Sequence, residues 1–106
     1  MTLPSHEAFL EALGSTFRVQ EVVGLGGPTE LVLRSLDDRR APAGWECFSM
    51  LFEVNRSSPL QQGNYPMTHE SLGALELFIV PIGERAGMKT CEVIIYRPLP
   101  TSDILR

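Results

Sequence analysis

A chain of 106 residues has the size of one globular domain, so a single hydrophobic core is expected and a second independent domain is not. Hydrophobic residues make up 43% of the chain and charged residues 21%, which excludes a disordered tail or a coiled coil. The formal net charge of -4 provides no positive field to attract phosphates, and nucleic-acid binding is therefore disfavoured.

The first residues do not have the features of a secretory signal. A basic segment is missing after Met1, and Glu11 interrupts the apolar positions that follow. The longest apolar run, Leu77 to Pro81, has the length of a strand, whereas a membrane-spanning helix needs about 20 apolar residues. We therefore expect a cytoplasmic protein that does not bind a membrane.

Two cysteines, Cys47 and Cys91, lie in segments expected to be strands and do not form a CxxC spacing. In a cytosolic chain such thiols are usually reduced, so we expect buried free cysteines. The sequence leaves open whether the two are adjacent and could pair.

The first expected element is a short helix from Ser5 to Leu13. The Ser5 hydroxyl can cap the N-terminus of this helix, and Gly14 stops the pattern. Between them, four apolar residues are spaced to form one face of the helix: Phe9, Leu10, Ala12 and Leu13.

From Thr16 onward, apolar residues recur with a period of two, in segments separated by turns that contain glycine or proline. Pro66 suits an edge strand, because proline cannot donate to a ladder. The segment 74–82 is apolar on both faces and should be covered on both sides. The six expected strands are 16–23, 29–36, 47–54, 63–68, 74–82 and 89–97.

Six short strands with hairpin-length connections, and no crossover helices between them, predict a mainly β fold. We expect a single-domain antiparallel sandwich or small barrel over residues 1–106, with the short helix packed against it. The sequence does not decide between sandwich and barrel. Residues 98–106 form a C-terminal tail, in which Ile104 and Leu105 could dock on this molecule or on a neighbour.

Motifs that carry chemistry are sparse. The segment 24–27 is similar to a glycine-rich phosphate loop, but Pro28 and a strand follow it, whereas a phosphate loop is followed by a helix. The histidines His6 and His69 have no partner at a metal-ligand spacing, so neither a metal nor a cofactor is expected. A base, a carboxylate and a hydroxyl follow one another from His69 to Ser71, but without the GxSxG elbow of a serine hydrolase.

The segment from Asp37 to Glu46 is expected to be a long polar connection that exposes Trp45, the single tryptophan. Together with Arg39 and Arg40, Trp45 could contact a protein or a small ligand, because Trp and Arg carry much of the binding energy at interfaces. In the alternative interpretation, Trp45 folds back to cover the core. Both interpretations stay open at this point.

The strands carry more apolar surface than a nine-residue helix can cover. This excess favours self-association or a dedicated protein partner. The candidate interface residues lie in the doubly apolar strand, in the last strand and in the tail: Leu75, Leu77, Phe78, Val80, Ile94, Tyr96, Ile104 and Leu105.

Four segments, Phe48 to Val54, Gln62 to Tyr65, His69 to Gly73 and Leu77 to Gly83, resemble a family of small bacterial proteins known only as a domain of unknown function. Its pattern is an F-x-L-x-F strand, a QGTY turn, an H-x-x-L-G corner and an LFLVP-(V/I)-G strand; here Asn64 replaces the usual Thr. The resemblance implies a single β-rich domain of bacterial origin and brings no activity. Some relatives are similar to companions of phage-tail-collar-type proteins, which implies an assembly or accessory role beside such a partner.

These observations favour a non-enzymatic protein-binding or assembly module, because no catalytic set is recognisable and apolar strand surface is in excess. One alternative is a small-molecule or carbohydrate binder that uses the Trp45 loop, where an aromatic face meets polar neighbours. The other is a small hydrolase around His69 and Ser71. We expect a protein partner or a homo-oligomer, without nucleic acid, membrane or cofactor.

Overall fold

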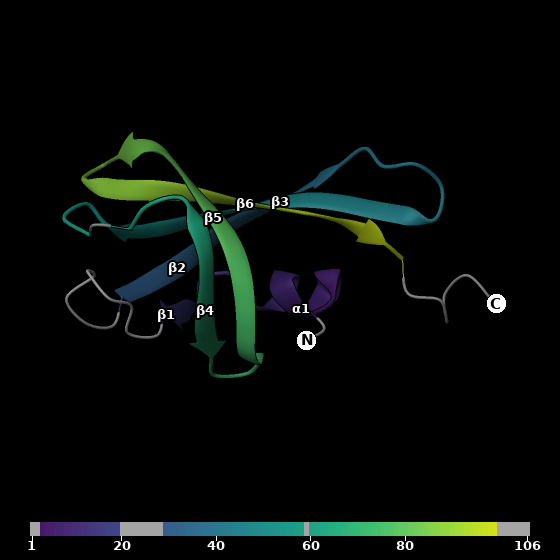
Figure 1. The fold of residues 1–106 in the computed structure, drawn as a ribbon, viewed down its shortest axis with the longest axis horizontal. Helices are drawn as coiled ribbons and strands as arrows, with labels where there is room; N and C mark the ends of the chain where they lie inside the picture. Colours follow the sequence, from purple (N-terminus) through teal and green to yellow (C-terminus); the bar gives the residue numbers. More distant parts are fainter. Residues whose placement is uncertain (1–2, 20–28, 59, 100–106) are drawn as a thin grey trace.

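The computed structural model describes residues 3–19, 29–58 and 60–99, and within them it contains one helix and six antiparallel strands. The strands form one closed barrel in the order β1-β2-β3-β6-β5-β4 (Figure 1). The mainly β prediction is confirmed, and of the two architectures left open the barrel is the one formed. The elements are α1 (His6–Glu11), β1 (Thr16–Val19), β2 (Thr29–Arg39), β3 (Trp45–Asn55), β4 (Gly63–His69), β5 (Gly73–Arg85) and β6 (Met88–Pro98).

Helix α1 begins as predicted but ends earlier. The Ser5 hydroxyl accepts a hydrogen bond from the Ala8 N–H at 3.1 Å, which caps the N-terminus. The helix ends at Glu11, because the following backbone bonds to β2: the Gly14 N–H donates to the Leu33 carbonyl at 2.7 Å. Of the expected apolar face, Phe9 and Ala12 are buried, whereas Leu10 and Leu13 are exposed.

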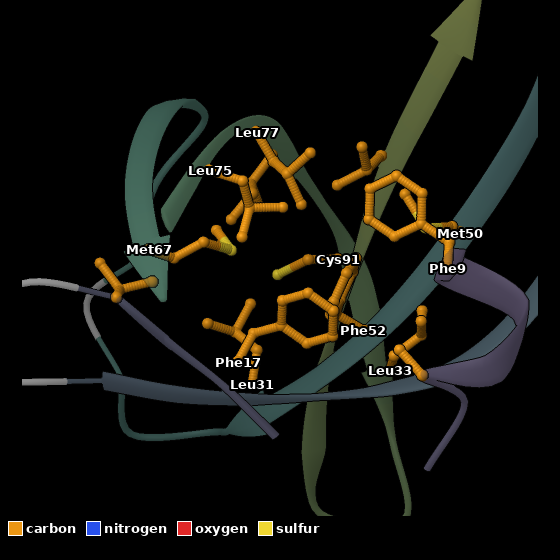
Figure 2. Packing of buried hydrophobic residues seen from close by; sticks show 14 of the residues in the cluster. Phe9, Phe17, Leu31, Leu33, Met50, Phe52, Met67, Leu75, Leu77 and Cys91 are labelled. Atoms are coloured by element: carbon orange, nitrogen blue, oxygen red, sulfur yellow. The ribbon is translucent and has the colours of Figure 1, made fainter. Parts of the chain in front are cut away.

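The barrel interior is filled by every second residue of each strand, as the period of two requires. The rings of Phe17 and Phe52 meet edge to face at 5.2 Å near its centre. Figure 2 shows Leu75 and Leu77 of β5 among these buried side chains, near Cys91. Helix α1 lies below β3 and β6 in Figure 1, and its Phe9 ring is 6.1 Å from that of Phe48, so the helix adds to the same core.

The β2–β3 hairpin is longer than predicted. The ladder continues through Asp37↔Ser49 to Arg39↔Cys47, so only residues 40–44 remain as the connection. The prediction of a long polar connection from Asp37 to Glu46 is wrong, because the ladder satisfies backbone groups whatever the polarity of the side chains. Trp45 is consequently the first residue of β3.

The barrel closes at a seam between β1 and β4. Among the described residues, this ladder contains the pairs from Phe17↔His69 to Val19↔Met67. β4 therefore pairs on both sides, with β1 and with β5, and the prediction of an edge strand at Pro66 is wrong for β4 as a whole.

Strands β5 and β6 stay paired for only part of their length. Their ladder runs from Arg85↔Met88 to Val80↔Glu92, with a register shift between Pro81 and Gly83. Beyond that point β5 turns away and pairs with β4, while β6 continues beside β3 (Figure 1). The two strands thus separate half-way along the barrel.

Candidate interaction surface

Large apolar side chains project from the outer face of β3 and β6. Because Val93 and Ile95 point into the core, the alternation places Ile94 and Tyr96 outside, where they are 54% and 57% exposed. Trp45 is 41% exposed, and its ring lies 5.0 Å from that of Tyr96 with 35° between the planes. We call Trp45, Ile94 and Tyr96 the outer patch.

An ion pair borders the outer patch. Arg39 lies opposite Cys47, which lies opposite Tyr96, and the Arg39 guanidinium contacts the Glu92 carboxylate at 3.4 Å. A second ion pair lies on the other face of the same strands, where Arg97 donates to Glu46 at 2.6 Å and the Arg97 guanidinium lies 5.7 Å from the centre of the buried Phe48 ring. The middle of the patch is therefore apolar, and the charges beside it are already balanced.

The structure places the predicted binding residues in different environments. Trp45 does not fold back over the core; it lies against Tyr96 at the start of a strand. Arg39 is in β2 at the border of the outer patch, and Arg40 is exposed in the short connection. Two of these three residues thus lie at one surface, although they do not form a long recognition loop.

The predicted interface residues divide in the same way. Ile94 and Tyr96 belong to the outer patch, Phe78 is exposed on β5, and Val80 is half-buried. Leu75 and Leu77 are only 2% exposed, so their assignment to an interface is wrong. The face of β5 that carries Leu75 and Leu77 lines the barrel, so the core covers it and no partner protein is needed there. Ile104 and Leu105 lie outside the described residues.

His69 is held by three hydrogen bonds at the corner between β4 and β5. Its Nδ1 accepts the backbone N–H groups of Ser71 and Leu72 at 3.0 and 3.1 Å. The ring proton must therefore be on Nε2, which donates to the Ser15 hydroxyl at 2.6 Å, and that hydroxyl donates to the Ala12 carbonyl. The sequence analysis missed this network, since Ser15 and His69 are far apart in the chain.

The direction of these hydrogen bonds decides what chemistry the corner can perform. In a serine hydrolase, the histidine nitrogen accepts the proton of the nucleophilic hydroxyl. Here the imidazole donates to Ser15, and both ring nitrogens are occupied. Ser71, which was the serine of the hydrolase hypothesis, contacts the ring through its backbone N–H. The arrangement therefore joins three segments of the fold and does not activate a nucleophile.

In the described residues, the side chains that could bind a metal or form a disulfide are not grouped together. In the part of the chain that the structure describes, no three His, Cys, Asp or Glu side chains are close enough to hold a metal ion. His6 contacts Asp38 at 2.6 Å and links α1 to β2. Cys47 and Cys91 are both free thiols. Cys47 of β3 lies opposite Tyr96, and Cys91 of β6 lies opposite Phe52, so the two cysteines are five residues apart along the β3–β6 ladder.

No helix within the described ranges is long and apolar enough to cross a membrane.

Comparison with known proteins identifies a family. A protein-family model described as a domain of unknown function, DUF6916, matches residues 4–95. The chain belongs to this family. No curated protein and no solved structure matches it. The DUF6916 match includes the helix, five complete strands and β6 up to Ile95, so Ile94 lies inside it and Tyr96 just beyond its end.

Proposed function

We propose that this DUF6916 protein is a non-enzymatic protein-binding module with a role in assembly, and that it binds through the outer patch. The observation that supports this most is the exposure of Trp45, Ile94 and Tyr96 side by side on two paired strands. Half-exposed side chains of this size leave roughly 300 Å² of apolar surface in contact with water. Contiguous apolar patches of this size on monomeric proteins are often functional.

Some relatives in the family that the sequence resembles are similar to companions of phage-tail-collar-type proteins, which agrees with this proposal. An accessory protein in an assembly needs a surface for its partner and no catalytic site. The paired charges around the outer patch also suit such a role, because Arg39 and Glu92 can remain bound to each other when the apolar centre is covered.

The experiment that tests the proposal compares the wild type with Tyr96→Glu, which puts a charge in the outer patch. Leu10→Glu is the matched control, because Leu10 is a similarly exposed apolar residue on α1. The solution mass by light scattering and the proteins captured from a lysate of the native cells are measured for all three. We expect association that Tyr96→Glu abolishes and Leu10→Glu retains. If neither the mass nor the captured proteins depend on Tyr96, the proposal is wrong.

A second candidate function is the binding of a small molecule or carbohydrate beside Trp45. It is supported by an open hollow next to this side chain, lined by His6, Asp38, Arg39 and Trp45 among others. Aromatic faces with polar neighbours bind sugars in many proteins. Trp45 fluorescence during titration with a set of mono- and oligosaccharides tests this function. A saturable change that Arg39→Ala removes would support it, and no change with any sugar would exclude this ligand class.

A further inference from the structure

The second half of β6 has an open edge. β6 pairs with β3 along its whole length, from Met88 to Pro98. On its other side the ladder with β5 ends at Glu92, and in the described ranges no strand pairs with the segment from Val93 to Pro98 on that side. Figure 1 shows β5 leaving β6 at this point. An open edge presents unpaired backbone N–H and C=O groups, which can pair with another chain.

Between Glu92 and Arg97, this edge lacks the protection that other strand edges in the described part of the barrel have. The half of β2 that extends beyond the ladder with β1 carries Arg34, Asp37, Asp38 and Arg39. The corresponding half of β5 contains a proline, a register shift, and then Glu84 and Arg85. Charges, proline and bulges all discourage edge-to-edge pairing. Between Glu92 and Arg97, β6 instead presents only Ile94 and Tyr96 on its outer face.

We propose that a second copy of this chain pairs with the open edge, so that the two β6 strands run antiparallel about a two-fold axis through Ile95. This inference rests on the proposed function and names the partner of the outer patch. In this register Ile94 of each copy lies directly opposite Tyr96 of the other, twice in the dimer. Aromatic residues opposite β-branched residues are favourable cross-strand pairs.

The charges at the edge agree with this register. Glu92 remains paired with Val80 of β5 and lies outside the new ladder. Arg97 lies opposite Val93 of the second copy, so no charged residue lies opposite the same residue of the second copy. Arg97 also keeps its partner within the same molecule, Glu46 at 2.6 Å. The proline at position 98 limits the new ladder to the segment before it, because proline has no N–H to donate.

The area sets the strength of this association. The outer patch supplies roughly 300 Å² of apolar surface per copy, whereas a standard stable interface buries about 800 Å² per partner. We therefore expect a dimer in exchange with the monomer, with a dissociation constant of about 1–100 μM. A partner protein with an extended segment could occupy the same edge, and the experiment below separates these two occupants.

The experiment uses the full chain and two opposite charges. Ile94→Lys and Tyr96→Glu each place a charge opposite an apolar residue in both pairs, and each variant alone should self-associate at least about tenfold more weakly than the wild type. When the two variants are mixed, the heterodimer has one Lys–Glu pair and keeps one native Ile–Tyr pair. Sedimentation should therefore detect a dimer in the mixture and not in either variant alone. A mixture of Leu10→Lys and Leu10→Glu is the control.

A second measurement requires no variant. Amide hydrogen exchange of the wild type is followed from about 1 μM to about 1 mM protein. We expect the amides between Val93 and Arg97 to become more protected as the concentration rises. The amides of β2 from Arg34 to Arg39 should not change, because this edge is charged.

Each outcome decides the inference. A wild-type dimer with recovery in the mixture and protection of β6 supports it. A dimer without that recovery or protection overturns the β6 pairing and leaves the outer patch as a binding surface of another geometry. A monomer at every concentration also overturns the inference, and protein capture that depends on Tyr96 would then retain the proposed function with an extended partner. A monomer without such capture removes both.

Discussion

Replacement of His69 by alanine tests whether the corner between β4 and β5 is a structural joint. The substitution removes three hydrogen bonds, two at Nδ1 and one at Nε2, and a ring contact with Phe17 at 4.5 Å. At about 1 kcal/mol for each hydrogen bond and about 1 kcal/mol for the ring pair, the free energy of unfolding should fall by about 4 kcal/mol. A domain of this size has a total of about 5–15 kcal/mol.

Urea denaturation followed by Trp45 fluorescence measures this change. With an m-value of about 2 kcal/mol per molar urea, the midpoint of unfolding should move down by about 2 M. His69→Asn should cost about half as much, because an Asn side-chain oxygen can accept the N–H groups of Ser71 and Leu72 in the way that Asx turns do.

Ser15→Ala isolates the other side of the same network. It should cost about 1 kcal/mol, since the Ser15 hydroxyl contacts His69 and the Ala12 carbonyl at a partly buried site. The reasoning fails if His69→Ala costs less than about 1 kcal/mol, or if His69→Asn costs as much as His69→Ala. Either result would mean that water satisfies the two backbone N–H groups without the imidazole.

Three further predictions concern the core, a turn and a thiol. Phe52→Ala should lower the free energy of unfolding by about 3–5 kcal/mol in urea titrations, whereas Phe78→Ala on the exposed face of β5 should lower it by less than about 1 kcal/mol. Gly14→Ala should lower the free energy of unfolding by about 1–2 kcal/mol, because Gly14 has a φ of +83°, which strains a residue with a Cβ. A steric clash is not the cause, because no atom other than those of the adjacent residues lies close to the added Cβ. An unchanged free energy of unfolding would show that the turn relaxes. Burial raises the pKa of the Cys91 thiol, an effect that Lys89 opposes. The folded state therefore holds the thiol proton more tightly than the unfolded chain, and stability should fall as the pH rises above the ordinary thiol pKa of about 8.5. Cys91→Val should flatten this slope, and an unchanged slope would assign it to another group.

The alternation of side chains was enough to predict most of the fold. A period of two in β6 places Val93 and Ile95 in the core and Ile94 and Tyr96 outside, and the structure has them so. The Ser5 cap of α1 was predicted from the same local information. Both depend only on residues that are near one another in the chain.

Features that depend on distant residues could not be predicted in this way. Leu75 and Leu77 were assigned to an interface, because the sequence of β5 is apolar on both faces and does not indicate which face lines a barrel. The separation of β5 from β6 after Glu92 follows from the register of three strands, which a single sequence does not contain. The hydrogen bond between Ser15 and His69 likewise depends on closure of the barrel.

The seam between β1 and β4 also bears on how this barrel forms. It joins residues 17–19 to residues 67–69, and β1 and β4 are separated in the chain by β2 and β3. Contacts between residues that are distant in the chain form only after the entropy of closing a long loop has been lost. The seam should therefore form after the ladders that join consecutive strands, such as β2 with β3 and β4 with β5. Each opening uncovers Phe17 and Val19, so the lifetime of the seam sets how often the core is exposed to proteases and to aggregation.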